Sequence, residues 1–197
     1  MENLITLVVA ALPLMGTPGP VTMASAAAGA AWPRRVAALY VLGMTTGTLT
    51  VISLVAAGLS GLVLALPGVA PVLAAGAAAY ILYLAWKIAN APPMGSLERG
   101  MAPPAMFGGY AMAVANPKAW AAFTALFSGY PLFDQPSVAG TVLKVAFLAG
   151  LALAANLTWM WVGSRLAEAM QSPRASRALN VFFAVLLVVS VVLGFVL

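Results

Sequence analysis

The sequence contains no cysteine and no histidine. The chain therefore cannot form a disulfide, a thiol relay, a haem ligand or an imidazole metal site. Charged residues are also scarce, at 7% of the 197 residues, and only four of them are acidic. We therefore predict no metal site and no cofactor. We also predict no catalytic residues, because no group of Ser, His, Asp or Cys within the apolar segments could supply a nucleophile and its base.

What the sequence does contain is apolar. Hydrophobic residues make up 63% of the chain and the mean hydropathy is +1.04, so there is too little polar surface for a water-soluble domain. We predict an all-α integral membrane protein whose main partner is the lipid bilayer. Six apolar runs each meet the length of roughly 20 residues that a spanning helix needs: about 3–28, 36–66, 69–91, 105–132, 143–164 and 178–197.

The basic residues outnumber the acids by nine to four. Most fall between the apolar runs rather than on one polar face, which favours the membrane surface over nucleic acid as their partner. Arg34 and Arg35 follow the first run, Lys87 ends the third, and Arg165 ends the fifth. By the positive-inside rule, these connections face the cytoplasm and both chain termini face outward.

Two apolar runs are interrupted by proline. The first contains Gly16-Thr17-Pro18-Gly19-Pro20 and the fourth contains Ala115-Asn116-Pro117-Lys118. Proline lacks an N–H and displaces the carbonyl four residues before it, so each interruption frees backbone groups that need partners. Paired breaks in corresponding segments point to the binding site of a transporter. The alternative is that both are ordinary kinks satisfied by neighbouring helices.

Each half is predicted to contain three helices. Because three is an odd number, the second half enters the membrane from the opposite side to the first. The sequence thus predicts one transmembrane transporter domain, 1–197, built as a 3+3 inverted repeat with halves of about 1–98 and 99–197 and with broken first and fourth helices. At a rise of 1.5 Å per residue, both breaks lie near the bilayer midplane. They could therefore face one cavity.

Lys118 is the one charge that this layout places near the bilayer centre. A charge there is costly and is a functional hypothesis by default, although the side chain could instead extend toward the membrane surface. Asn156, in the middle of the fifth run, could contact a substrate or form an interhelical hydrogen bond. Gly43 and Gly47, with neighbouring threonines, predict close helix packing in the second run.

We predict a substrate site that combines the two breaks with the buried polar groups. Its residues are Gly16, Thr17, Pro18, Gly19, Pro20, Asn116, Pro117, Lys118 and Asn156. Lys118 would hold the carboxylate of a small zwitterionic metabolite, most plausibly a neutral amino acid, whereas a cationic side chain would meet repulsion with no acid to offset it. The rival hypothesis is a non-transporting helix-packing module of a larger complex, which would have a dry, filled centre.

Three segments resemble the LysE/RhtB family of bacterial amino-acid exporters: Thr17-Pro18-Gly19-Pro20, the run from Ala79 to Lys87, and Asn116-Pro117-Lys118-Ala119. The resemblance covers most of the chain. It implies a six-helix inner-membrane protein that exports amino acids in exchange for protons, with both breaks at the central site.

The chain departs from that family at two positions. Members usually carry an acid directly after the first break and another in the middle of the fifth span, where this chain has Val21 and Asn156. Proton coupling through those two carboxylates is therefore excluded, and passive facilitation stays open beside proton exchange. The sequence leaves open whether the protein forms a homo-oligomer.

Overall fold

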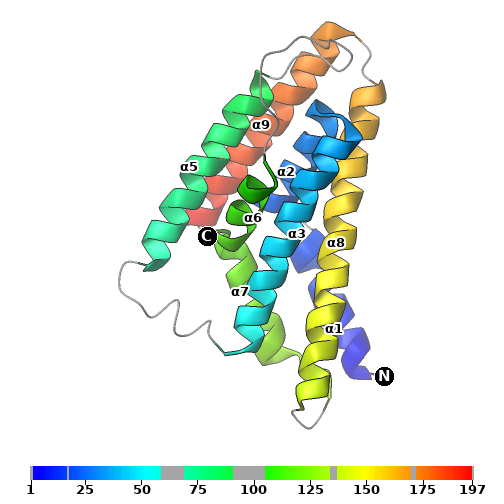
Figure 1. The fold of residues 1–197 in the computed structure, drawn as a ribbon, viewed down its shortest axis with the longest axis vertical. Helices are drawn as coiled ribbons and strands as arrows, with labels where there is room; N and C mark the ends of the chain where they lie inside the picture. The colour runs from blue at the N-terminus through cyan, green and yellow to red at the C-terminus, as the bar shows by residue number, and fades with distance from the viewer. Residues whose placement is uncertain are drawn as a thin grey trace.

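A computed structural model describes residues 2–16, 18–58, 69–90, 105–133, 137–169 and 172–196, and within these ranges all regular structure is helical. This agrees with the predicted all-α class. Figure 1 shows most of the helices running along the long axis of the molecule. In chain order they are α1 (Glu2–Gly16), α2 (Pro20–Ala31), α3 (Arg34–Ala56), α5 (Val69–Ala89), α6 (Met106–Val114), α7 (Pro117–Gly129), α8 (Val138–Ala169) and α9 (Pro173–Val196).

Two of the described helices are long and apolar enough to cross a bilayer, namely Arg34–Ala56 and Val138–Glu168. The pair α1 and α2 makes a third span if it is counted as one helix with a bend of 58°. Length and composition in the described part of the chain therefore support an integral membrane protein.

Both predicted breaks separate two helices. Pro20 and Pro117 each stand at the start of the helix that follows the break, where the missing N–H would have no partner inside the helix anyway. Asn116 caps α7, because its Oδ1 accepts a hydrogen bond from the Lys118 backbone N–H at 3.2 Å. Proline is therefore the local cause of the break in the first span. In the fourth span, proline and the N-capping residue Asn116 together cause the break.

The second apolar run, predicted over about 36–66, contains helix α3, and its residues 59–66 lie outside the described part of the chain. Helix α3 ends at Ala56, and Gly58 follows with φ of 78°. This left-handed conformation commonly ends a helix, and glycine adopts it without steric cost. The apolar pattern continued past this point, so hydropathy alone did not reveal the end.

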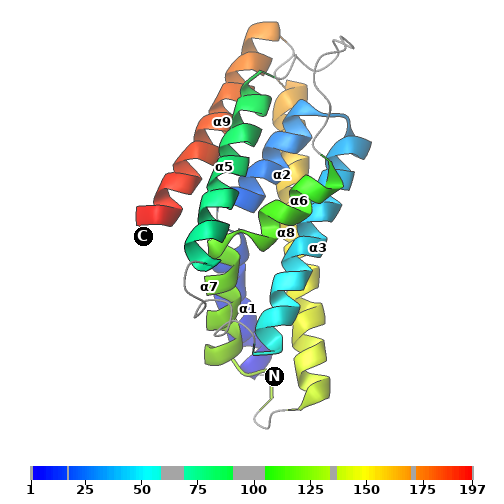
Figure 2. The same cartoon turned by 60° about the vertical axis from the view of Figure 1, so that its left-hand side comes forward.

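The helices of the two halves pack against one another in a reciprocal way. Helix α2 of the first half lies along α8 of the second, and α6 of the second half lies along α3 of the first. The third helices of the halves, α5 and α9, lie side by side in both views (Figures 1 and 2). A helix of each broken span thus packs against the helix that follows the broken span of the other half.

Glycine brings α2 and α8 into backbone contact. A Cβ atom at Gly29 would overlap the carbonyl of Met160, and one at Gly163 would overlap the carbonyl of Ala26. Only glycine permits this approach, in which dispersion contacts between backbones replace side-chain packing.

The same packing joins α3 to α6. Cβ atoms at Gly43 and Gly47 would overlap the carbonyls of Met106 and Tyr110. The close helix packing predicted for the second apolar run is confirmed.

One end of the molecule carries a cluster of charges, which we call the basic end: Arg34, Arg165 and Glu168. Glu168 on α8 pairs with Arg34 on α3 at 3.0 Å and with Arg165 at 2.9 Å. The first pair joins the start of α3 to the end of α8, whereas the N-terminus of the chain lies at the opposite end (Figure 1).

Lys144, in the early part of α8, lies toward the opposite end of the molecule. Its side chain is 4% exposed, and its ammonium donates hydrogen bonds to the carbonyls of Leu126 and Tyr130 at the end of α7. The ammonium also lies 4.6 Å from the centre of the Phe127 ring. Lys144 therefore caps the C-terminus of α7, where the helix dipole favours a cation.

Candidate functional site

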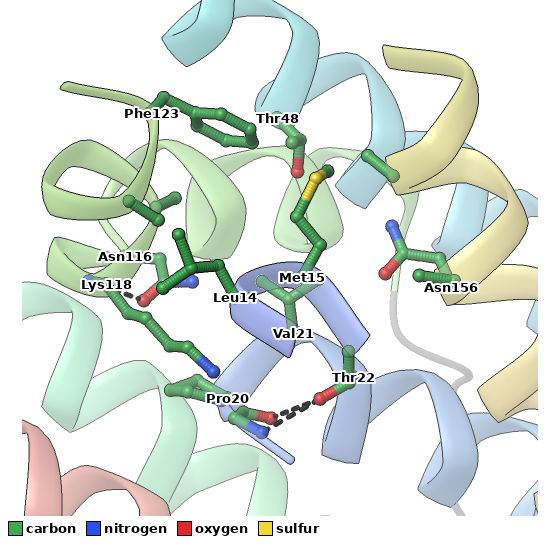
Figure 3. Close-up of a pocket in the computed structure, with 15 residues that line it drawn as sticks. Leu14, Met15, Pro20, Val21, Thr22, Thr48, Asn116, Lys118, Phe123 and Asn156 are labelled. Carbon is green, nitrogen blue, oxygen red and sulfur yellow. Dashed lines mark hydrogen bonds between the residues drawn. The ribbon is translucent and has the colours of Figure 1, made fainter. Parts of the chain in front are cut away.

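A pocket lies beside both breaks, where residues of α1, α2, α3, α7 and α8 meet (Figure 3). Its volume is about 60 Å³, which is room for roughly four water molecules. Among the described residues, its lining consists of Leu14, Met15, Gly19, Pro20, Val21, Thr22, Thr48, Asn116, Lys118, Ala119, Ala122, Phe123, Ala152, Ala155 and Asn156.

The structure brings together five of the nine predicted site residues. Gly19 and Pro20 from the first break, Asn116 and Lys118 from the second, and Asn156 from α8 all line the pocket. These residues come from both halves of the chain. The two breaks therefore face a single cavity.

The other four predicted residues are not among the described lining. Gly16 ends α1, and the side chains of Pro18 and Pro117 are exposed. Thr17 lies outside the described residues. Gly16, Pro18 and Pro117 therefore belong to the breaks themselves and are not among the described residues of the pocket wall.

Lys118 reaches from α7 across to the start of α2. Its Nζ lies so close to Gly19 that a Cβ atom there would be 3.1 Å from it. In Figure 3 the side chain runs past Asn116 toward Pro20 and Thr22. Glycine at position 19 therefore leaves the space that the ammonium needs.

The first turns of two helices also face the pocket. Pro20, Val21 and Thr22 open α2, and Lys118 and Ala119 open α7. Backbone N–H groups in a first turn have no partner inside their own helix and give that end a partial positive charge. With the ammonium of Lys118, the two helix ends make this side of the pocket suited to an anion such as a carboxylate.

A search against family models matches the chain to the LysE type translocator model over residues 12–197. The chain belongs to the LysE type translocator family. None of the curated proteins and none of the solved structures matches this chain. The matched residues include both breaks and every described residue of the pocket wall. The pocket of this LysE type translocator therefore lies entirely within the part of the chain that matches the family model.

The resemblance leads us to expect acids at two positions where this chain has Val21 and Asn156, and both of these residues line the pocket. Asn156 is 3% exposed, and its Nδ2 donates to Thr45 Oγ1 at 3.4 Å. Asn156 therefore forms the interhelical hydrogen bond that the sequence analysis considered, linking α8 to α3, and it also lines the pocket. No acid is among the described lining residues, and Glu168 lies at the basic end with its two arginines.

Two tryptophans satisfy backbone carbonyls at the breaks. The Trp159 indole N–H donates to the Gly16 carbonyl at 3.2 Å, and that of Trp120 donates to the Val114 carbonyl at 2.7 Å. Pro20 deprives the Gly16 carbonyl of its helical partner, while the Val114 carbonyl loses its partner because the Lys118 N–H bonds to Asn116 instead. Trp159 thus lies at the first break, and Trp120 lies at the second.

Sequence reasoning missed the apolar part of the wall and two threonines. Thr22 closes the first break, because its hydroxyl accepts from the Gly19 N–H at 2.8 Å and donates to the Gly19 carbonyl at 3.1 Å. Thr48 belongs to the small-residue face of α3, which we had interpreted as packing alone. Ordinary apolar residues of a spanning helix give no local signal that distinguishes a pocket wall from a helix contact.

Proposed function

We propose that this LysE type translocator exports small zwitterionic metabolites, in particular neutral amino acids, across the bacterial inner membrane. The observation that carries the proposal is the position of Lys118, which stands in the first turn of α7 and extends its ammonium to the start of α2. A substrate carboxylate fits this positive side of the pocket. The amides of Asn116 and Asn156 offer hydrogen bonds to its other polar groups.

The rival function is a helix-packing module that transports nothing. Such a module needs a filled centre, with helices in contact at both breaks. The cavity beside the breaks, with the partly buried Lys118 side chain in its wall, favours transport instead.

We also propose six membrane spans in a 3+3 inverted repeat. The reciprocal packing of α2 on α8 and α3 on α6 supports this arrangement. We place the basic end in the cytoplasm and both termini outside, as the distribution of arginine indicates.

Single cysteines test the orientation, since the chain has none of its own. Ser172 and Ser137 are exposed and stand before α9 and α8, at the basic end and the opposite end respectively. We expect Ser172→Cys to react with a membrane-impermeant maleimide only after the cytoplasmic side is opened. Ser137→Cys should react in intact cells, and the reverse pattern would show that the orientation is inverted.

Counterflow in proteoliposomes tests the function itself. We expect purified protein in vesicles preloaded with unlabelled L-leucine to accumulate radiolabelled L-leucine transiently, whereas protein-free vesicles do not. An imposed pH gradient in the same vesicles separates the two coupling modes, because proton exchange drives net accumulation and passive facilitation ignores the gradient. Absence of counterflow for every neutral amino acid would favour the packing module.

A further inference from the structure

The pocket has a polar side and an apolar side. The polar side holds Thr22, Asn116 and Lys118, close to the two helix N-termini. Figure 3 shows the Phe123 ring and the Met15 side chain away from the Lys118 ammonium. A ligand whose carboxylate lies at Lys118 therefore directs the rest of its structure toward apolar atoms.

Charge limits what this apolar side accepts. Lys118 is the one charged side chain in the described lining. A second ammonium on a substrate would be buried without an anionic partner, and a second carboxylate would need a second cation. The pocket therefore favours substrates whose side chains carry no charge.

Alanines form much of the apolar wall. Ala119 and Ala122 come from α7, and Ala152 and Ala155 come from α8. Ala122 and Ala152 are 8% and 5% exposed, so neither residue lies on the open surface of the molecule. The small area that stays accessible at each faces the pocket or a narrow gap. A methyl group at these positions leaves room that a larger residue would fill. The small volume of the cavity makes each added carbon matter.

We propose that this translocator selects carboxylates with short aliphatic side chains, and that Ala122 and Ala152 set the upper limit of side-chain size. This inference rests on the proposed function, because it names the substrate class of the same pocket. The apolar wall contributes affinity by burying the substrate's aliphatic carbons, and the two alanines exclude substrates that are too long or aromatic.

The test compares L-alanine with L-leucine. In counterflow we expect Ala122→Leu and Ala152→Leu to reduce the rate for leucine by about ten-fold while the rate for alanine stays within about two-fold, since a hydrophobic pocket discriminates by this order for a small change in size. Ala121→Leu and Ala154→Leu are matched controls, because both residues are exposed on the same two helices. The controls should leave both rates unchanged.

Two further variants at the same position keep the proposal testable if Ala122→Leu does not fold. Ala122→Val should shift the preference in the same direction by a smaller factor, and Ala122→Gly should raise the rate for L-phenylalanine relative to L-leucine. Wild-type protein should transport neither L-lysine nor L-glutamate at a rate near that of L-leucine. Equal loss of alanine and leucine transport in Ala122→Leu, or lysine transport as fast as leucine transport, would overturn the proposed selectivity.

Ligand-induced thermal stabilisation in detergent separates the two proposals. A ligand that binds the folded state raises its stability by an amount that increases with the logarithm of the ratio of ligand concentration to Kd. Stabilisation of wild type by leucine that is lost in Ala122→Leu, without any counterflow, would contradict transport but support the selectivity. Counterflow of leucine that Ala122→Leu and Ala121→Leu reduce equally would support transport and contradict the selectivity.

Discussion

Lys118→Met is expected to weaken binding of L-leucine on the order of 100-fold and to abolish its counterflow, because truncating one member of a buried charge pair costs several kcal/mol. Methionine fills a similar volume without the charge. The folded protein should be at least as stable as wild type, since an ammonium no longer has to be kept in an apolar environment. Counterflow, with thermal unfolding of the purified variant, measures both effects.

The matched control is Lys87→Met. Lys87 lies in the last turn of α5, away from the pocket, where its ammonium is 5.7 Å from the centre of the Tyr83 ring. We expect this variant to transport at a rate within about two-fold of wild type. Normal transport by Lys118→Met would show that the ammonium does not bind substrate, and the side chain would then be better explained by extension toward the membrane surface.

Gly163→Leu is expected to prevent stable packing of α2 on α8, with a loss of about 3 kcal/mol or more in the free energy of unfolding. The added side chain would overlap the backbone carbonyl of Ala26, which cannot move away as a flexible side chain could. The helices would have to separate, and the contacts around Gly29 and Met160 would be lost with them. We expect little folded protein in detergent, and a clear fall in melting temperature for whatever folds.

Gly150→Leu is the control on the same helix. A Cβ atom at Gly150 meets no other atom within 4 Å, and leucine has a better helix propensity than glycine by nearly 1 kcal/mol. This variant should therefore fold as well as wild type or better. Equal melting temperatures for the two variants would mean that α2 and α8 do not approach as closely as described.

The sequence determined the local features of this protein. Its apolar composition specified a membrane protein, because only the hydrocarbon interior of a bilayer can surround so much apolar surface. Proline interrupted two helices near Gly16 and Asn116, since it cannot supply the hydrogen bond that a continuous helix requires. The amide of Asn116 could then cap α7, and the family motifs at both breaks were readable from consecutive residues.

Tertiary structure decided what lies opposite each of these features. The indole of Trp159 reaches the carbonyl of Gly16 from the far half of the chain, and Lys144 caps the end of α7 from α8. Thr48 and Ala152 belong to the pocket wall only because α3 and α8 pack beside both breaks. Local hydropathy is the same for a residue that faces lipid, another helix or a cavity, so only the packing of distant helices can distinguish these environments.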